Sequence, residues 1–279
     1  MDPFVEVPEE KWPKLLEKLK EVWPMNAPGY YALNLHLKYP ALRAAFKFTV
    51  YCPFNDIEAG FIATTQKENV IECIIWPFSG DTTKLVEALI NTTVVNWTKV
   101  TCIDTVTSQV LDMLERIKSD IGFSYFHVGR VDTYFLDQSV ATLNNVGCPS
   151  GTYLAPIKKD LIPYVDEKWP YRHETSTHYF STLAENGLSY GLYSSRDHRL
   201  LAWLFINEYS FLCHLYCEGD QRRRGYAEFL MRHVVNKQLS SGNGVYSYVE
   251  KGNERSGALF RKLGFAVIDE GAYVYVQKL

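Results

Sequence analysis

The chain has 279 residues, of which 47% are hydrophobic, which suits two domains of ordinary size with real cores. The formal net charge of −3 gives no global basic field, so we do not expect nucleic acid as a partner. No apolar run approaches the ~20 residues that a membrane-spanning helix needs, so we do not expect a membrane partner either.

The first half of the chain mixes helical and extended patterns. Apolar residues at helical spacing predict a helix over residues 8–22, with a buried face of Trp12, Leu15, Leu16, Leu19 and Val22. Residues 30–39 are ambiguous, because their apolar residues alternate as in a strand. Next come predicted strands at 46–51, 60–64 and 70–76, a helix at 83–90, an extended segment at 100–103 and a helix at 109–121.

A dense run of turn-forming residues at 144–151 is the best linker candidate. It divides the chain into domains at 1–148 and 149–279. The elements predicted after it are a strand at 153–155, helices at 158–165 and 174–185, and strands at 189–193 and 200–206.

The most informative stretch runs from a predicted strand at 211–216 into a helix that begins at Gly225. Its apolar face consists of Ala227, Leu230, Met231 and Val234. A strand that leads into a glycine at a helix start leaves backbone N–H groups pointing at one spot, where the helix dipole attracts anions. The arginines at 222–224 would add charge for a polyphosphate. The simpler interpretation of these arginines is a solvated basic turn.

A second helix with clear end signals follows downstream. After a short strand at 245–249, Asn253 is a helix-start residue and Gly264 a left-handed stop. In this order, the strand, phosphate turn, helix, strand and Asn-headed helix resemble the Gcn5-related N-acetyltransferase (GNAT) superfamily. The string VYSYVEKGN resembles its glycine N-acyltransferase-like branch.

The resemblance is specific from residue 151 to 279 and looser over 1–148, where it rests on the run at 24–30 and on Val95-Asn96-Trp97. It implies an α/β (α+β) protein of tandem GNAT-like domains, with a mixed sheet flanked by helices. The N-terminal half is expected to be degenerate, because it has no phosphate turn of its own.

The resemblance also implies that acetyl-CoA or another acyl-CoA is the cosubstrate. The backbone of Leu215, Tyr216 and Cys217 would pair with the pantetheine arm, and amides from Arg223 to Ala227 would bind the pyrophosphate. Most of the superfamily has Gly at the position of Arg223. An arginine suits a tight loop less well than glycine does, so the loop is expected to be less tight here. The full implied set is Leu215, Tyr216, Cys217, Arg222, Arg223, Arg224, Gly225, Tyr226, Ala227, Asn253, Ser256, Phe260 and Arg261.

Two of these residues have competing roles. Asn253 is either a plain N-cap, worth about 1 kcal/mol, or a contact to the pantetheine. Arg261 either meets the adenosine end of CoA or lies on a solvated helix face.

The residues that would move protons depart from the superfamily pattern. Phe211 stands where the family has a glutamate base, so the candidates are Glu208 and His214. We expect Glu208 to lie where the sheet opens, partly buried among apolar neighbours, as a base near neutral pH requires. His214 has a suitable ordinary pKa of ~6.5, but strand alternation predicts that it faces away from the side of Phe211.

The expected acid is also missing. Phe260 replaces the superfamily's tyrosine, and Tyr248 is the nearest phenol, either as the acid or as a packed strand aromatic. Cys213 and Cys217 would allow an acyl-enzyme, although buried thiols are the simpler interpretation. The six cysteines contain no CxxC pair, so we expect no metal site.

These features predict an N-acyltransferase that moves an acyl group from acyl-CoA to a small amine such as glycine by direct attack. The alternatives are a peptide or protein N-acetyltransferase and a non-catalytic CoA-binding protein, because Phe211 and Phe260 replace both proton-handling residues. We expect a cytoplasmic location, since no presequence is visible, although the mammalian enzymes that the chain resembles are mitochondrial.

Overall fold

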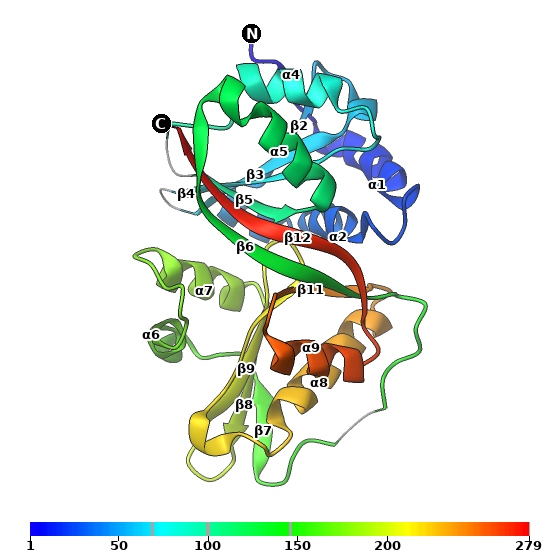
Figure 1. The fold of residues 1–279 in the computed structure, drawn as a ribbon. Helices are drawn as coiled ribbons and strands as arrows, with labels where there is room; N and C mark the ends of the chain where they lie inside the picture. The colour runs from blue at the N-terminus through cyan, green and yellow to red at the C-terminus, as the bar shows by residue number, and fades with distance from the viewer. Residues whose placement is uncertain (68–69, 99–100, 145–146, 279) are drawn as a thin grey trace. The chain divides into compact units, whose positions relative to one another are not determined.

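The computed structural model describes residues 1–67, 70–98, 101–144 and 147–278. Backbone contacts divide the chain into two compact units (Figure 1). Unit 1 comprises Met1–Thr133, Val249–Gly252 and Val267–Leu279, and unit 2 comprises Tyr134–Tyr248 and Asn253–Ala266. Each unit therefore combines separate stretches of the chain, so no single position divides them. The domain boundary predicted at residue 148 stays a prediction.

Unit 1 is built on a mixed sheet. Its elements are β1 (Phe4–Glu6), α1 (Trp12–Lys20), α2 (Ala27–Lys38), α3 (Pro40–Phe46), β2 (Thr49–Pro53), β3 (Phe61–Lys67), β4 (Val70–Trp76), α4 (Thr83–Asn91), β5 (Thr101–Val106), α5 (Ser108–Ile121) and most of β6 (Phe123–Leu136) and β12 (Ala266–Lys278). The strand order is β1-β2-β3-β4-β5-β12-β6-β11, where β11 is Val245–Glu250. β1 to β4 run antiparallel, whereas β4 and β5 are parallel.

The period of two along β3 and β4 sends alternate side chains to opposite faces of this sheet. Ile62 and Ile75 join the core formed with α4 and α5. Trp76, next along the strand, points to the other face, where its ring lies against Gly29 of α2 and its indole N–H donates to Asn26 at 3.1 Å. The run at 24–30 is therefore the segment that packs the start of α2 on the sheet.

Gly29 allows this close packing, because a Cβ added there would lie 2.8 Å from two ring carbons of Trp76. We expect Gly29→Ala to destabilise the protein by about 1–3 kcal/mol through overpacking. The measurement is thermal unfolding followed by circular dichroism. Gly80→Ala is the matched control, since nothing lies within 4 Å of its added Cβ. An unchanged melting temperature for Gly29→Ala would contradict this packing.

Four details of unit 1 differ from the sequence prediction. Residues 30–39 lie mostly in helix α2, whose buried residues surround most of the helix and so hide a single-face pattern. Val22 lies beyond α1 and is 47% exposed, so it is not part of the buried face. Phe46 ends α3 rather than starting a strand. The long strands β6 and β12 were not predicted at all.

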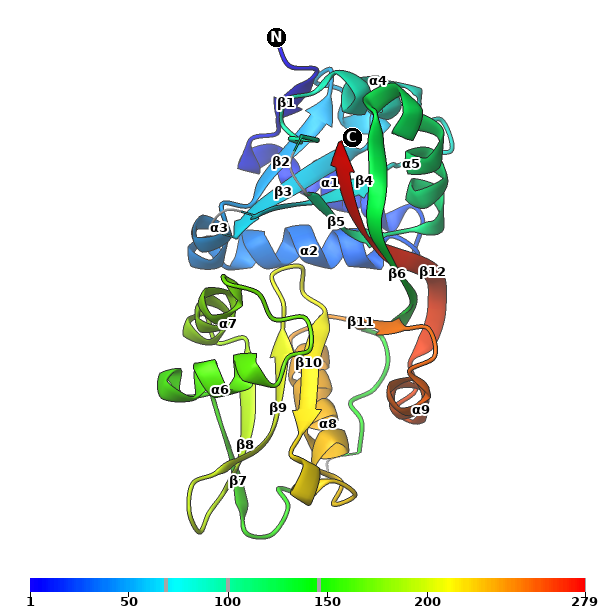
Figure 2. The same ribbon diagram turned by 60° about the vertical axis from the view of Figure 1, so that its left-hand side comes forward.

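Unit 2 contains an antiparallel sheet in the order β10-β9-β8-β7. Its elements are β7 (Thr152–Ala155), α6 (Ile162–Glu167), α7 (Ser176–Glu185), β8 (Ser189–Ser194), β9 (Leu200–Ile206), β10 (Leu212–Cys217), α8 (Tyr226–Ser240), the first part of β11 and α9 (Glu254–Lys262). Helix α8 packs on one face of this sheet, and α6 and α7 lie on the other (Figures 1 and 2). The predicted class, α/β with a mixed sheet flanked by helices, is confirmed.

The predicted linker at 144–151 falls partly outside the described residues, at 145–146. Across the described ranges, no helix is long and apolar enough to cross a membrane. Those same ranges contain no group of three or more His, Cys, Asp or Glu side chains that could hold a metal ion.

Candidate functional site

The turn between β10 and α8 has the backbone of a tight loop. After a short 3-10 turn at Gly219–Gln221, Arg223 has a φ of +65° and Gly225 a φ of +79°. Arg223 thus adopts the left-handed conformation that glycine favours, at a cost of roughly 1–2 kcal/mol. The arginine at this position does not open the loop. The predicted helix start at Gly225 is confirmed, since Gly225 is the N-cap of α8.

The start of α8 offers several free donors. No side chain caps the helix, and its first bond runs from the Phe229 amide to the Gly225 carbonyl at 2.9 Å. Within the described part of the chain, the amides of Tyr226, Ala227 and Glu228 therefore have no acceptor. Nothing lies within 4 Å of the Cβ position of Gly225, so a ligand can approach the backbone there.

The arginines give this turn a local positive charge. Arg222, Arg223 and Arg224 are exposed, and none pairs with an acidic side chain in the described ranges. The Arg222 Nε donates to the Cys217 carbonyl at 3.3 Å, which ties the turn to the end of β10. Free amides, the helix dipole and unpaired guanidinium groups together favour a polyphosphate.

A network that the sequence analysis missed holds the turn in place. Arg199 donates to both carboxylate oxygens of Asp220, at 2.8 and 2.9 Å, and this pairing lowers the pKa of Asp220 to about 2. Glu218 accepts a hydrogen bond from the Tyr164 hydroxyl at 2.5 Å. Burial, together with Glu218, raises the pKa of Tyr164 to about 12. These partners are far apart in sequence, so no local pattern indicated them.

Strand β10 has one edge without a strand partner. Among the described strands it pairs only with β9, while β11 lies at the end of the other sheet. Two side-chain hydrogen bonds connect β11 to β10 and to the turn before it: Ser247 Oγ donates to the Leu212 carbonyl at 2.7 Å, and the Tyr246 hydroxyl donates to the Tyr209 carbonyl. The edge of Leu215, Tyr216 and Cys217 can therefore pair with an extended ligand, as the resemblance implied.

A β-bulge interrupts β10 at His214. Cys213 is opposite Phe205 and Tyr216 is opposite Trp203, so His214 and Leu215 share one partner residue. His214 has a φ of +54°, so regular strand alternation does not apply at this residue, and the predicted facing of its side chain stays a prediction. A bulge takes a residue out of the regular ladder, and a backbone N–H group in such a bulge can stabilise developing negative charge on a carbonyl oxygen.

The His214 ring lies in an aromatic environment. Its centroid is 5.0 Å from that of Trp169 and 4.8 Å from that of Phe180. Its Nε2 lies 3.4 Å from the Tyr179 hydroxyl. These contacts describe a packed, half-buried histidine and leave open whether it also moves a proton.

Glu208 lies in the turn between β9 and β10. The Asn207 Oδ1 accepts hydrogen bonds from the amides of Tyr209 and Phe211, at 2.9 and 3.1 Å, and these bonds fold the turn inward. Glu208 is 0% exposed. The expectation of a partly buried residue at an opening of the sheet is therefore wrong, because the tight turn encloses it.

Tyr248 is half-buried near the end of β11. Its ring meets that of Phe211 edge to face, with centroids 5.0 Å apart. Phe211 itself is 7% exposed, so the position of the family's base is an apolar packing residue. Tyr248 thus has the contacts of a packed strand aromatic, while its use as an acid stays a prediction.

Helix α9 starts and ends where the sequence predicted. Asn253 is its N-cap, and its Oδ1 accepts a hydrogen bond from the Ser256 amide at 3.2 Å. Gly264, with a φ of +88°, follows its end. The capping role of Asn253 uses only its oxygen, so the side-chain amide nitrogen is not needed for the cap.

The two other predicted α9 residues are engaged within unit 2. Phe260 is 5% exposed and packs on Tyr134 and Phe265, with centroids 5.3 and 5.0 Å away. Arg261 donates to the Tyr134 hydroxyl at 2.9 Å and lies 3.6 Å from Glu254. Phe260 thus packs inside unit 2, whereas Arg261 has contacts within unit 2 and its predicted contact to the adenosine end of CoA stays a prediction.

Comparison with known proteins relates this geometry to a superfamily. A family model described as FR47-like protein matches residues 189–274. The X-ray structure of a Drosophila protein is 17% identical, with 100% of this chain and 99% of that chain covered and a TM-score of 0.86. A tandem GNAT protein from the clavulanic acid biosynthesis pathway is 12% identical, with 99% and 98% covered and a TM-score of 0.60. This chain has a tandem GNAT fold.

A Gcn5-related N-acetyltransferase from Sphaerobacter thermophilus shows the same fold at 12% identity. The match covers 100% of this chain and 96% of the Sphaerobacter thermophilus chain, with a TM-score of 0.57. No curated protein matches the sequence. The comparisons therefore show the fold, and membership of the GNAT superfamily and of its glycine N-acyltransferase-like branch is left as a proposal.

The first GNAT repeat provides an internal comparison. Its series β4–α4–β5–α5 has the same order as β10–α8–β11–α9 in the second. In the first repeat, however, β4 and β5 pair in parallel, with Cys73 opposite Ile103, so this edge is occupied. Asp81 also accepts hydrogen bonds from the Thr83 amide and hydroxyl, at 3.0 and 2.6 Å, which places a carboxylate at the start of α4.

We therefore expect the protein to bind one CoA thioester per chain, through the second GNAT repeat. In the first repeat the Asp81 carboxylate repels phosphate and the strand edge has no room for pantetheine. Isothermal titration calorimetry with acetyl-CoA measures this stoichiometry. A value of two per chain would contradict the assignment of the first repeat as degenerate.

Proposed function

We propose that this protein is an acyl-CoA-dependent N-acyltransferase that acylates a small amine such as glycine. One observation carries the proposal: the unpaired edge of β10 leads directly into an uncapped, arginine-flanked helix start at Gly225. Together these features suit a ligand with an extended amide-containing arm followed by a pyrophosphate. Coenzyme A is a ligand of this kind.

In the proposed complex, each group of residues has one task. Leu215 to Cys217 hold the arm through backbone hydrogen bonds, and the amides from Arg223 to Ala227 hold the phosphates. The side-chain amide nitrogen of Asn253, which the cap does not use, would contact the arm. The bulge at His214 supplies a backbone N–H for the oxyanion, which is worth about 3–4 kcal/mol when a donor is well placed.

The environments of Cys213 and Cys217 favour direct attack by the amine over a mechanism with an acyl-enzyme intermediate. Burial raises the pKa of the Cys217 thiol, which lowers its thiolate fraction at neutral pH. The Cys213 Sγ lies 3.7 Å from the Phe205 carbonyl, to which it donates. We propose that the amine attacks the thioester carbon and loses a proton to the base, for which Glu208 and His214 are the candidates. The C–S bond then breaks, and CoA leaves as a thiol after protonation, with Tyr248 as the candidate acid.

A non-catalytic CoA-binding protein is the second candidate. It is favoured by the burial of Phe211 and Phe260, which are only 7% and 5% exposed at the two positions where the family handles protons. A peptide acceptor, the third possibility, has no specific observation in its favour.

Two assays of the purified protein test the proposal. We expect calorimetry to detect binding of acetyl-CoA or a longer acyl-CoA, and a thiol-release assay to show CoA release that depends on the added amine. Panels of acyl-CoAs, amino acids and short peptides then define both substrates. Binding without amine-dependent release would favour the non-catalytic protein, and no binding at millimolar acyl-CoA would refute both.

A further inference from the structure

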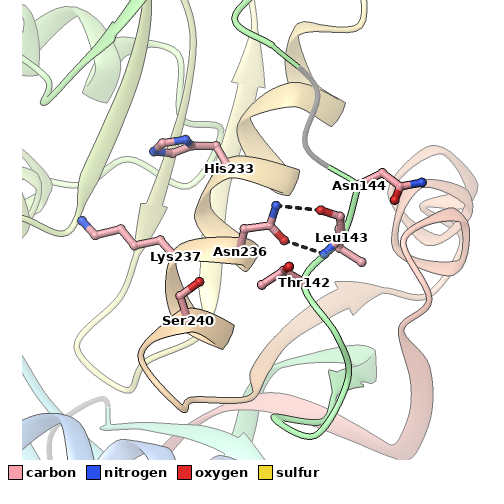
Figure 3. A pocket seen from close by; sticks show the side chains of 7 residues that line it. All are labelled: Thr142, Leu143, Asn144, His233, Asn236, Lys237 and Ser240. Atoms are coloured by element: carbon pink, nitrogen blue, oxygen red, sulfur yellow. Dashed lines mark hydrogen bonds between the residues drawn. The ribbon is translucent and has the colours of Figure 1, made fainter.

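A polar cavity of about 510 Å³ lies along the second half of α8 in unit 2 (Figure 3). Helix residues His233, Asn236, Lys237 and Ser240 line it, together with the segment that contains Thr142 and Leu143. Lys237 lies eleven residues after Tyr226, the first residue of α8. At 1.5 Å per residue this is ~16 Å along the helix, so the cavity is separate from the phosphate turn.

A paired hydrogen bond fixes the wall of this cavity. The Asn236 Nδ2 donates to the Leu143 carbonyl at 2.9 Å, and the Leu143 amide donates to the Asn236 Oδ1 at 2.7 Å (Figure 3). The side-chain amide thus acts like a strand partner for the chain beside it. This pair fixes one wall of the cavity, while the exposed side chains of His233, Lys237 and Ser240 leave the cavity open to solvent.

The cavity carries positive charge, and none of its described lining residues has a carboxylate. His233 and Lys237, one turn apart, project from the same side of α8 (Figure 3). The Lys237 ammonium donates to the Tyr190 hydroxyl at 3.2 Å and lies 4.9 Å from the centre of that ring. It forms no ion pair with an acidic side chain of the described ranges. Partial burial and the charge of Lys237 lower the pKa of His233.

We propose that this cavity is a second ligand site, which takes a small organic monocarboxylate. Among the described lining residues Lys237 is the only permanent cation, which matches one negative charge, and the hydroxyls of Thr142 and Ser240 can donate to a carboxylate. Leu143 offers an apolar surface to the body of the ligand. A volume of about 510 Å³ lies within the usual range for small-molecule sites.

Benzoate titration of the full chain, followed by ¹H NMR of the histidine ring protons, tests this site. His233→Gln identifies the signal of His233. We expect a saturable shift of that signal with benzoate and none with benzamide, the neutral analogue, at constant ionic strength.

The groups that face His233 are Lys237 on α8 and Tyr190 on β8. A bound carboxylate beside them should raise the pKa of His233, and binding should weaken as pH rises through it.

Variants at Lys237 separate a binding site from general charge. We expect Lys237→Gln to weaken benzoate binding about tenfold, as the loss of a charged hydrogen-bond donor does, and Lys237→Arg to retain it. Lys159→Gln, the matched control, removes one charge from an exposed lysine elsewhere in unit 2 and should bind like the parent. Thermal unfolding shows whether each variant is folded.

Four results would overturn the proposal. Equal effects of benzoate and benzamide would show that charge is not recognised. Unchanged binding by folded Lys237→Gln would place the ligand elsewhere. Loss of the benzoate signal under saturating CoA would make the cavity part of the CoA site rather than a second one. Orthophosphate binding without benzoate binding would refute the carboxylate class. None of these results depends on catalytic activity.

Discussion

Gly225→Asp is expected to abolish acyl-CoA binding and to leave the fold intact. The backbone at this residue is left-handed and open, and it precedes three amides without an acceptor. An aspartate adds bulk where the ligand meets the backbone and negative charge where its phosphates would lie. Such like-charge contact costs several kcal/mol, so calorimetry should show affinity at least ~100-fold weaker.

Two companion variants isolate the cause. Gly242→Asp makes the same change just beyond the other end of α8, where the glycine has a φ of +71° and nothing lies within 4 Å of the added Cβ. It should bind acyl-CoA like the parent. Gly225→Ala adds the backbone strain without the charge and should have an intermediate effect. If Gly225→Asp binds as tightly as the parent, the phosphate site lies elsewhere.

Glu208→Gln is expected to lower turnover by ~100-fold or more, with acyl-CoA affinity nearly unchanged. A positioned base contributes on this scale, and Glu208 is a fully buried ionisable side chain in the turn that leads into β10. Because the carboxylate is enclosed, the acceptor amine must reach it by displacing a covering group or through a bridging water. Single-turnover thiol release measures the chemical step.

His214→Gln provides the matched comparison on the same strand. We expect a smaller loss of turnover, because the aromatic contacts of His214 already account for its position. If His214→Gln costs more than Glu208→Gln, the histidine is the base. If both variants stay within about threefold of the parent, solvent takes the proton, and the protein acts mainly by holding its substrates together.

Much of the candidate site could be predicted because its signals are local. The apolar spacing after Gly225 belongs to a helix of one buried face, and in the structure Leu230, Met231 and Val234 are fully buried. Asn253 and Gly264 mark the ends of α9 through hydrogen bonds and backbone angles within a few residues. Such features require no knowledge of the rest of the chain.

Other features could not be predicted, because they depend on residues far away in sequence. Helix α2 is buried around most of its surface, so its composition carries no single-face period. The bulge at His214 exists only in relation to its partner strand β9. The enclosure of Glu208 and the pairing of Arg199 with Asp220 are likewise decided by tertiary packing.

The sequence by itself determined an arginine-rich turn that ends at Gly225, the strand and helix on either side of it and the order of the elements that follow. Tertiary structure alone decided which repeat presents a usable strand edge. β4 and β5 pair with each other, whereas β10 and β11 do not, although both pairs flank a helix in the same order. The physical reason is that backbone N–H and C=O groups are the same in every strand, so their partners are chosen by the packing of side chains from distant segments.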